Sequence, residues 1–184
     1  NFVAKGGDKF KYNYNLNSDV VSAFAQGQFN YNKVDFYAAA KLSITSHQRE
    51  GLFQNGRFLN NSIGKSEKIK FTDFGVKAGA TYKVTGRHLV SLNTAYLTNA
   101  PTIRNSFSNS RENNNTVENL VSEKIFSTDV NYILRSPIVT SRLTAYYTAV
   151  KDATEISFYF ADGIGGDNTA FVQEILSGID KKHF

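Results

Sequence analysis

The chain contains no cysteine, no methionine and no tryptophan, and it has only two prolines. Without cysteine it can form neither a disulfide nor a thiolate metal site. The three histidines, His47, His88 and His183, lie too far apart in the sequence to form a short metal-binding motif. We therefore expect no metal site and no cofactor.

Long apolar runs are also missing. No stretch of about 18 apolar residues is present, so the sequence predicts no transmembrane helix. The mean hydropathy is −0.35, which is compatible with membrane-spanning β-strands because these need apolar side chains only at alternate positions. The chain has no initiator methionine and no signal peptide, and we expect it to be part of a larger protein.

Charge is only mildly unbalanced. The chain has 21 lysines and arginines against 16 aspartates and glutamates, which gives a net charge of +5. Such an excess is compatible with an anionic partner, but it more often reflects solubility and the charge of loops or pores. We expect no nucleic-acid partner.

Tyrosine and phenylalanine are abundant, with 10 and 15 residues, and apolar and polar side chains alternate along much of the chain. In residues 19–31, for example, Val21, Ala23 and Phe29 share one face, whereas Ser22 and Gln26 lie on the other. A period of two residues is typical of a β-strand with two different faces. We therefore predict an all-β fold.

The alternating segments are grouped in pairs that predict three hairpins with short turns, at residues 19–45, 72–97 and 124–150. The turns lie at residues 32–33, 85–86 and 135–137. Gly86 can adopt a positive φ in the second turn. Pro137 is tolerated in the third turn because it lies outside the hydrogen-bonded ladder.

Long polar connections separate these hairpins, at residues 47–68, 98–122 and 151–177, and we expect a strand extension at residues 155–161 near the start of the last one. Outer-membrane barrels have this asymmetry, with short periplasmic turns and long outer loops. Strands of about 12 residues, at roughly 3.3 Å each and tilted by about 40°, span about 30 Å of membrane. We therefore predict an antiparallel transmembrane β-barrel segment of six to eight strands.

The two faces of the predicted strands also differ. On the face expected to contact lipid, aromatic residues lie near the strand ends, where membrane barrels carry aromatic girdles: Phe29, Tyr31, Tyr82 and Tyr96. Lys41 and Lys77 fall on the opposite, lumen-facing side. A lysine at mid-bilayer on the lipid face would cost about 2–4 kcal/mol.

Several loop and turn stretches carry a resemblance to a known family: residues 48–53, 61–66, 78–87, 100–107, 152–159 and 178–183. The most distinctive is Ala-Pro-Thr-Ile-Arg-Asn-Ser-Phe at residues 100–107. The chain resembles TonB-dependent receptors of the kind common in Bacteroidota. The resemblance implies a barrel of about 22 strands with a plugged lumen, of which residues 1–184 form a part that lacks the N-terminal plug.

The same resemblance implies location and partners. It places the chain in the outer membrane of a Gram-negative bacterium, in contact with lipid and lipopolysaccharide. It also implies that the chain assembles with the plug and the remaining strands of the same receptor, and with TonB through the N-terminal part. A surface lipoprotein is a further candidate partner.

Nutrient import without catalysis is the expected function. The alternatives are a barrel with a structural or secretion role and no TonB coupling, and a secreted β-rich adhesin. Residues 64–66 resemble the end of a phosphate-binding loop, but Leu59 stands where that motif requires glycine. Ser46 and His47 are neighbours that point to opposite faces of a strand, which disfavours a catalytic pair.

Arginines in the outer loops are the candidate ligand-binding residues. Arg49 and Arg57 lie in one predicted loop, and Arg104 and Arg111 lie in the next, together with Asn113. Guanidinium and amide groups bind anionic or hydroxyl-rich ligands through paired hydrogen bonds. The alternative is that these side chains connect the long loops to one another or bind lipopolysaccharide phosphates.

Overall fold

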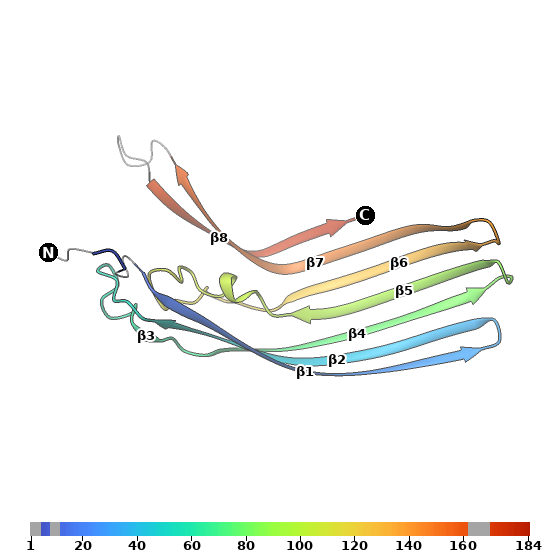
Figure 1. Cartoon of the computed structure of the whole chain (residues 1–184), viewed down its shortest axis with the longest axis horizontal. Helices are drawn as coiled ribbons and strands as arrows, with labels where there is room; N and C mark the ends of the chain where they lie inside the picture. Colours follow the sequence, from blue (N-terminus) through green and yellow to red (C-terminus); the bar gives the residue numbers. More distant parts are fainter. Residues whose placement is uncertain (1–4, 8–11, 162–169) are drawn as a thin grey trace.

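The computed structural model describes residues 5–7, 12–161 and 170–184. These residues form one antiparallel β-sheet in the order β1-β2-β4-β5-β6-β7-β8, with the short strand β3 paired to β2 (Figure 1). The predicted all-β fold is confirmed. In the described part of the chain the sheet is open, with β1 and β8 at its two edges.

Neighbouring strands follow one another in the sequence and pair antiparallel throughout. The elements are β1 (Tyr14–Tyr31), β2 (Val34–Gly51), β3 (Gly64–Lys65), β4 (Ile69–Lys83), β5 (His88–Asn99), the 3-10 turn η1 (Ile103–Asn105), β6 (Glu123–Arg135), β7 (Thr140–Ala161) and β8 (Ala170–His183). None of the helical segments described is long and apolar enough to cross a membrane.

The strands extend further toward the long connections than the sequence predicts. The predicted loop at residues 47–68 is too long, because β2 continues to Gly51. The predicted strand extension at residues 155–161 is confirmed, because β7 continues to Ala161. The rest of the predicted loop at residues 151–177 is too long, because β8 begins at Ala170; residues 162–169 lie outside the described residues. At the outer end of β2 the side chains from Gln48 to Glu50 are polar on both faces, so this part of the strand shows no apolar alternation in the sequence.

A bulge interrupts the pairing of β7 and β8. The register shifts between Val150 and Ala153, where Asp152 has a φ of 59° and Gly178 on β8 has a φ of 69°. Bulges of this kind bend a strand and increase its local twist. In Figure 1 the far ends of β7 and β8 accordingly turn away from the rest of the sheet.

The short turns are built in different ways. Asn32 adopts a φ of 48° in the turn between β1 and β2, a conformation that asparagine tolerates. The turn between β4 and β5 differs from the prediction, because Gly86 does not adopt a positive φ. Instead the Thr85 hydroxyl accepts hydrogen bonds from the backbone N–H groups of Arg87 and His88.

One face of the sheet is concave. η1 lies close to both β1 and β7, which are far apart in the strand order, so the sheet curves around it. On this concave face a polar chain crosses the strands. The Tyr37 hydroxyl donates to Asn93 Oδ1 (3.2 Å), Asn93 Nδ2 donates to Asp129 Oδ1 (2.8 Å), and the Thr144 hydroxyl donates to Asn131 Oδ1 (2.7 Å).

Gly79 makes room for this polar chain. It lies on β4 between Tyr37 on β2 and Asn93 on β5. A Cβ at this position would lie 2.4 Å from Asn93 Oδ1 and 2.5 Å from Tyr37 Cε1. The missing side chain thus lets the Tyr37 ring lie across β4 and reach Asn93.

We predict that Gly79→Ala breaks the Tyr37–Asn93 hydrogen bond and destabilises the folded protein by about 1–3 kcal/mol, as overpacking does. The change is measured as a lower midpoint of thermal unfolding of the purified protein in detergent. Gly86→Ala is the matched control, because an added Cβ there meets nothing within 4 Å. Equal midpoints for the two variants would contradict this role of Gly79.

Candidate functional site

The convex face carries a continuous apolar surface, which we call the apolar band. The ladder register places alternate side chains of six strands on this face, and no charged side chain lies among them between Phe74 and Tyr96 at one end and Phe36 and Tyr132 at the other. Its large apolar members are exposed, Val21 and Leu143 by 73% and 72%. The others include Phe36, Leu42, Ile44, Phe74, Val76, Val90, Leu92, Phe126 and Val130.

Aromatic side chains border the apolar band at the short-turn end. Phe29 and Phe36 stack with their ring centroids 5.1 Å apart, and His88 stacks on Tyr132 at 6.0 Å. His88 Nδ1 also lies 2.6 Å from the Tyr132 hydroxyl. Aromatic rings with a polar edge are favoured where an apolar layer meets water.

A second aromatic row borders the band at the long-loop end. Phe74 contacts Tyr96 at 5.9 Å between ring centroids, and Tyr147 contacts both Phe126 at 6.4 Å and Phe184 at 5.5 Å. The stretch of β4 from one aromatic row to the other corresponds to about 26 Å along the strand, or roughly 20 Å along the membrane normal. This is close to the height of about 25 Å of the lipid-facing band of outer-membrane barrels.

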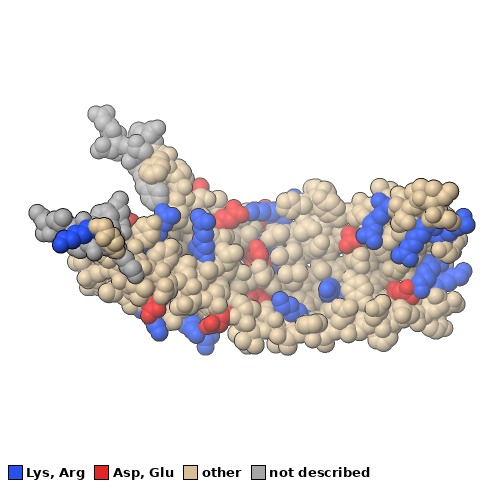
Figure 2. All heavy atoms as spheres, viewed as in Figure 1, with Lys and Arg blue, Asp and Glu red and all other residues tan. Residues whose placement is uncertain are grey.

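Charged groups on the convex face begin beyond the second aromatic row. Lys68 pairs with Asp19 at 3.5 Å, and Lys124 pairs with Asp152 at 2.7 Å. At the opposite end, basic side chains gather around the short turns, as Figure 2 shows. The band is therefore bounded by charge as well as by aromatic rings.

Arg49 connects the long loops on the concave side. Its side chain, only 1% exposed, lies beyond the apolar band at the outer end of β2. Arg49 Nε donates to the Ser110 carbonyl (2.7 Å), and Nη1 donates to the Ser62 carbonyl (3.0 Å) and to Asn114 Oδ1. Its guanidinium lies 5.4 Å from the centroid of the Tyr14 ring. Burial lowers the pKa of Arg49, and its interaction with Tyr14 opposes this shift.

The segment 100–118, which we call the crossing loop, lies across the concave face. On one side His47 Nε2 lies 3.0 Å from the Pro101 carbonyl. On the other side Asn105 Nδ2 donates to the Thr154 carbonyl of β7 (2.8 Å), and the Gln173 side chain of β8 donates to the Ser108 carbonyl. The crossing loop is therefore fixed to strands at both sides of the sheet.

The structure places the five predicted ligand-binding residues in two groups. Arg49 and Asn113 are buried, Asn113 with 4% exposure, and both hold loop backbone in place. This supports the alternative that these two residues connect the loops. Arg57 is 77% exposed and lies 3.9 Å from Glu112, Arg111 lies over the Tyr12 ring, and Arg104 is exposed on η1. These three arginines are accessible to a ligand.

Gly51 is a structural residue that the sequence did not single out. An added Cβ would lie 1.8 Å from the Ser62 carbonyl oxygen and 2.7 Å from Arg49 Nη1. The loop backbone packs directly on β2 at this point. No local sequence signal predicts such an approach, because it depends on how the loop folds back.

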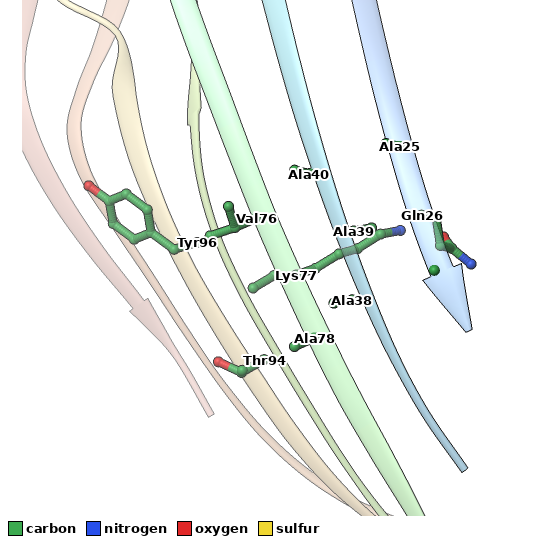
Figure 3. A pocket seen from close by; sticks show the side chains of 12 residues that line it. Ala25, Gln26, Ala38, Ala39, Ala40, Val76, Lys77, Ala78, Thr94 and Tyr96 are labelled. Atoms are coloured by element: carbon green, nitrogen blue, oxygen red, sulfur yellow. The ribbon is translucent and has the colours of Figure 1, made fainter. Parts of the chain in front are cut away.

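Small side chains on the convex face leave a hollow near the centre of the sheet. A shallow hollow of about 700 Å³ is lined mainly by convex-face residues of β1, β2 and β4, among them Ala25, Ala38 and Ala40 (Figure 3). The surface of this hollow is mainly aliphatic, with few polar groups such as the Thr94 hydroxyl. It suits contact with a lipid chain better than recognition of a polar ligand.

Within the part of the chain that the structure describes, no cluster of three or more histidine, aspartate or glutamate side chains is arranged to hold a metal ion. Comparison with known proteins adds no further assignment. No protein-family model matches the chain, and no match was found among curated proteins or solved structures.

We predict that Arg49→Gln releases the crossing loop, because each lost hydrogen bond from a charged donor contributes about 1.5–3 kcal/mol. Limited proteolysis should then cleave residues 100–118 at least roughly ten times faster than in the unaltered protein. Arg57→Gln is the control, because its side chain makes only a long, exposed ion pair. If both variants are cleaved at the same rate, Arg49 does not anchor the loop.

Proposed function

We propose that the chain forms part of the barrel wall of a TonB-dependent receptor that imports a nutrient across the outer membrane of a Gram-negative bacterium. The apolar band between two aromatic rows is the single observation that carries this proposal. Soluble monomers rarely expose contiguous apolar patches larger than a few hundred Å². A lipid bilayer is the environment in which such a face is stable.

The arrangement of the connections supports an outer-membrane orientation. Short and long connections alternate along the chain. Short turns join β1 to β2, β4 to β5 and β6 to β7 at one end of the sheet, and longer segments join β2 to β4 and β5 to β6 at the other. In outer-membrane barrels the short turns face the periplasm and the long loops face outward. On the outer side, Lys124 and Lys151 face each other across β6 and β7, a position suited to lipopolysaccharide phosphates.

Transport rather than a purely structural role is favoured by the crossing loop. A segment fixed across the concave face restricts passage through the lumen, which suits a gated receptor better than an open scaffold. The open edges of β1 and β8 suit pairing with the remaining strands of the receptor. In this proposal the plug and TonB supply the gating, and the exposed Arg57, Arg104 and Arg111 contribute ligand contacts.

The membrane orientation is tested with a pair of neighbouring substitutions on β1. Ala25 lies on the convex face and Gln26 on the concave face. We predict that Ala25→Arg destabilises the inserted protein by up to about 2–4 kcal/mol, whereas Gln26→Arg has little effect. The readout is the fraction of heat-modifiable, folded protein in isolated outer membranes. Equal folded fractions for the two variants would argue against lipid contact on the convex face.

The transport function is tested in the native organism. We predict that deleting the gene reduces uptake of one nutrient class when strains are screened on limiting iron chelates, oligosaccharides, peptides or cobalamin. Inactivating TonB should cause the same loss. Uptake that persists without TonB, or a deletion strain with no uptake defect but an altered envelope, would favour the structural or secretion role instead.

A further inference from the structure

The concave face contains a hollow of about 360 Å³ at the height of the apolar band. Its floor is formed by small residues of three neighbouring strands, Ala39, Gly75 and Ala95. The larger side chains of Phe24 and Leu97 line its sides. Gly75 is closely packed, since an added Cβ would lie 3.2 Å from Leu97 Cβ. The hollow therefore results from small residues on a continuous sheet.

Two lysines line this hollow. Lys41 pairs with Gly75, and Lys77 pairs with Ala39. The lysines are thus diagonal neighbours on adjacent strands, with Cβ atoms about 7–8 Å apart. Figure 3 shows the Lys77 side chain extending from β4 over Ala39 toward Gln26 on β1. Both ammonium groups can therefore approach one small ligand.

Neither lysine forms an ion pair within the described residues. Two other charged groups on this face have partners: Lys83 contacts Asp35 at 2.6 Å, and Asp129 accepts a hydrogen bond from Asn93. Asp73 is the other diagonal neighbour of Lys41 on β4, but its buried carboxylate makes no hydrogen bond and forms no ion pair with Lys41. With two lysines and one such carboxylate, the surroundings of the hollow keep a net positive charge.

Two like charges on adjacent strands repel each other, and an anion placed between them removes this repulsion. We infer that Lys41 and Lys77 form a binding site for a small anionic solute that carries a carboxylate or phosphate group. Gln26 and Ser43, which also line the hollow, supply neutral hydrogen-bond donors. This inference rests on the proposed function, because it requires the concave face to line a lumen in which the plug leaves this hollow open to water.

Residues 1–184 contain no cysteine, so a single introduced thiol provides a direct test. In outer membranes containing the full receptor, Ala39→Cys places one thiol beside Lys77, and the receptor without this substitution gives the background reaction of any other thiol. We predict that a sulfonate-bearing methanethiosulfonate reacts with it at least about ten times faster than the trimethylammonium analogue, because clustered charge raises the local concentration of counter-ions. Inorganic phosphate and citrate should each slow the sulfonate reagent.

Further variants show whether the charge preference at Ala39→Cys comes from Lys41 and Lys77 or from the positive charge of the whole surface. Adding Lys41→Gln and Lys77→Gln to Ala39→Cys should abolish both the charge preference and the protection by anions. Adding Lys33→Gln and Lys65→Gln, two lysines outside the hollow, should leave both unchanged. If the first pair of substitutions has no effect, or if phosphate and citrate give no protection, the anion site is overturned.

Ala40→Cys distinguishes failure of this site from failure of the proposed function. Its side chain lies on the convex face, so in lipid it should react with neither charged reagent. A rapid reaction at Ala40→Cys would overturn the membrane orientation itself. If Ala40→Cys does not react and Ala39→Cys reacts equally with both reagents, only the solute site is overturned. The same holds if Ala39→Cys does not react at all because another part of the receptor covers it.

Discussion

The antiparallel hydrogen-bond ladder is the constraint on which the rest of the structure depends. In lipid no water is available to satisfy backbone N–H and C=O groups, so they have to be paired within the sheet. The ladder of β1 and β2 pairs without a break from Tyr14–Gly51 to Tyr31–Val34. Because side chains alternate, this register also decides which residues lie on the convex apolar face. A slip of one residue would turn Lys41 and Lys77 toward that face.

The two faces are stabilised by different interactions. On the convex face, aliphatic side chains exposed in the isolated chain are suited to burial by lipid. On the concave face, specific hydrogen bonds such as Tyr37–Asn93 and Asn93–Asp129 hold the side chains in place. Gly79 keeps β4 paired with both neighbouring strands and leaves space for the Tyr37 ring. A small residue thus makes room for a large side chain on the concave face without interrupting the hydrogen-bond ladder.

The sequence predicted the parts of the fold that meet an apolar surface. Alternation in residues 19–45 identified β1 and β2, because one face of each requires apolar side chains. It missed the outer ends, such as Gln48 to Gly51, since this part of β2 packs against polar loops and not against an apolar surface. It also left the role of Arg49 open, because its partners Ser110 and Asn114 are 61 and 65 residues away. Contacts of that range depend on how the loops fold, which no local pattern records.

The open edges of β1 and β8 have a consequence for biogenesis. Each edge presents a row of backbone donors and acceptors that any extended segment can pair with, including another copy of the same strand. On β1 this row is 18 residues long. A newly made chain with such edges is prone to misassembly until other strands pair with them or cover them. Protection of these two edges is therefore a requirement for correct assembly, separate from the folding of the sheet itself.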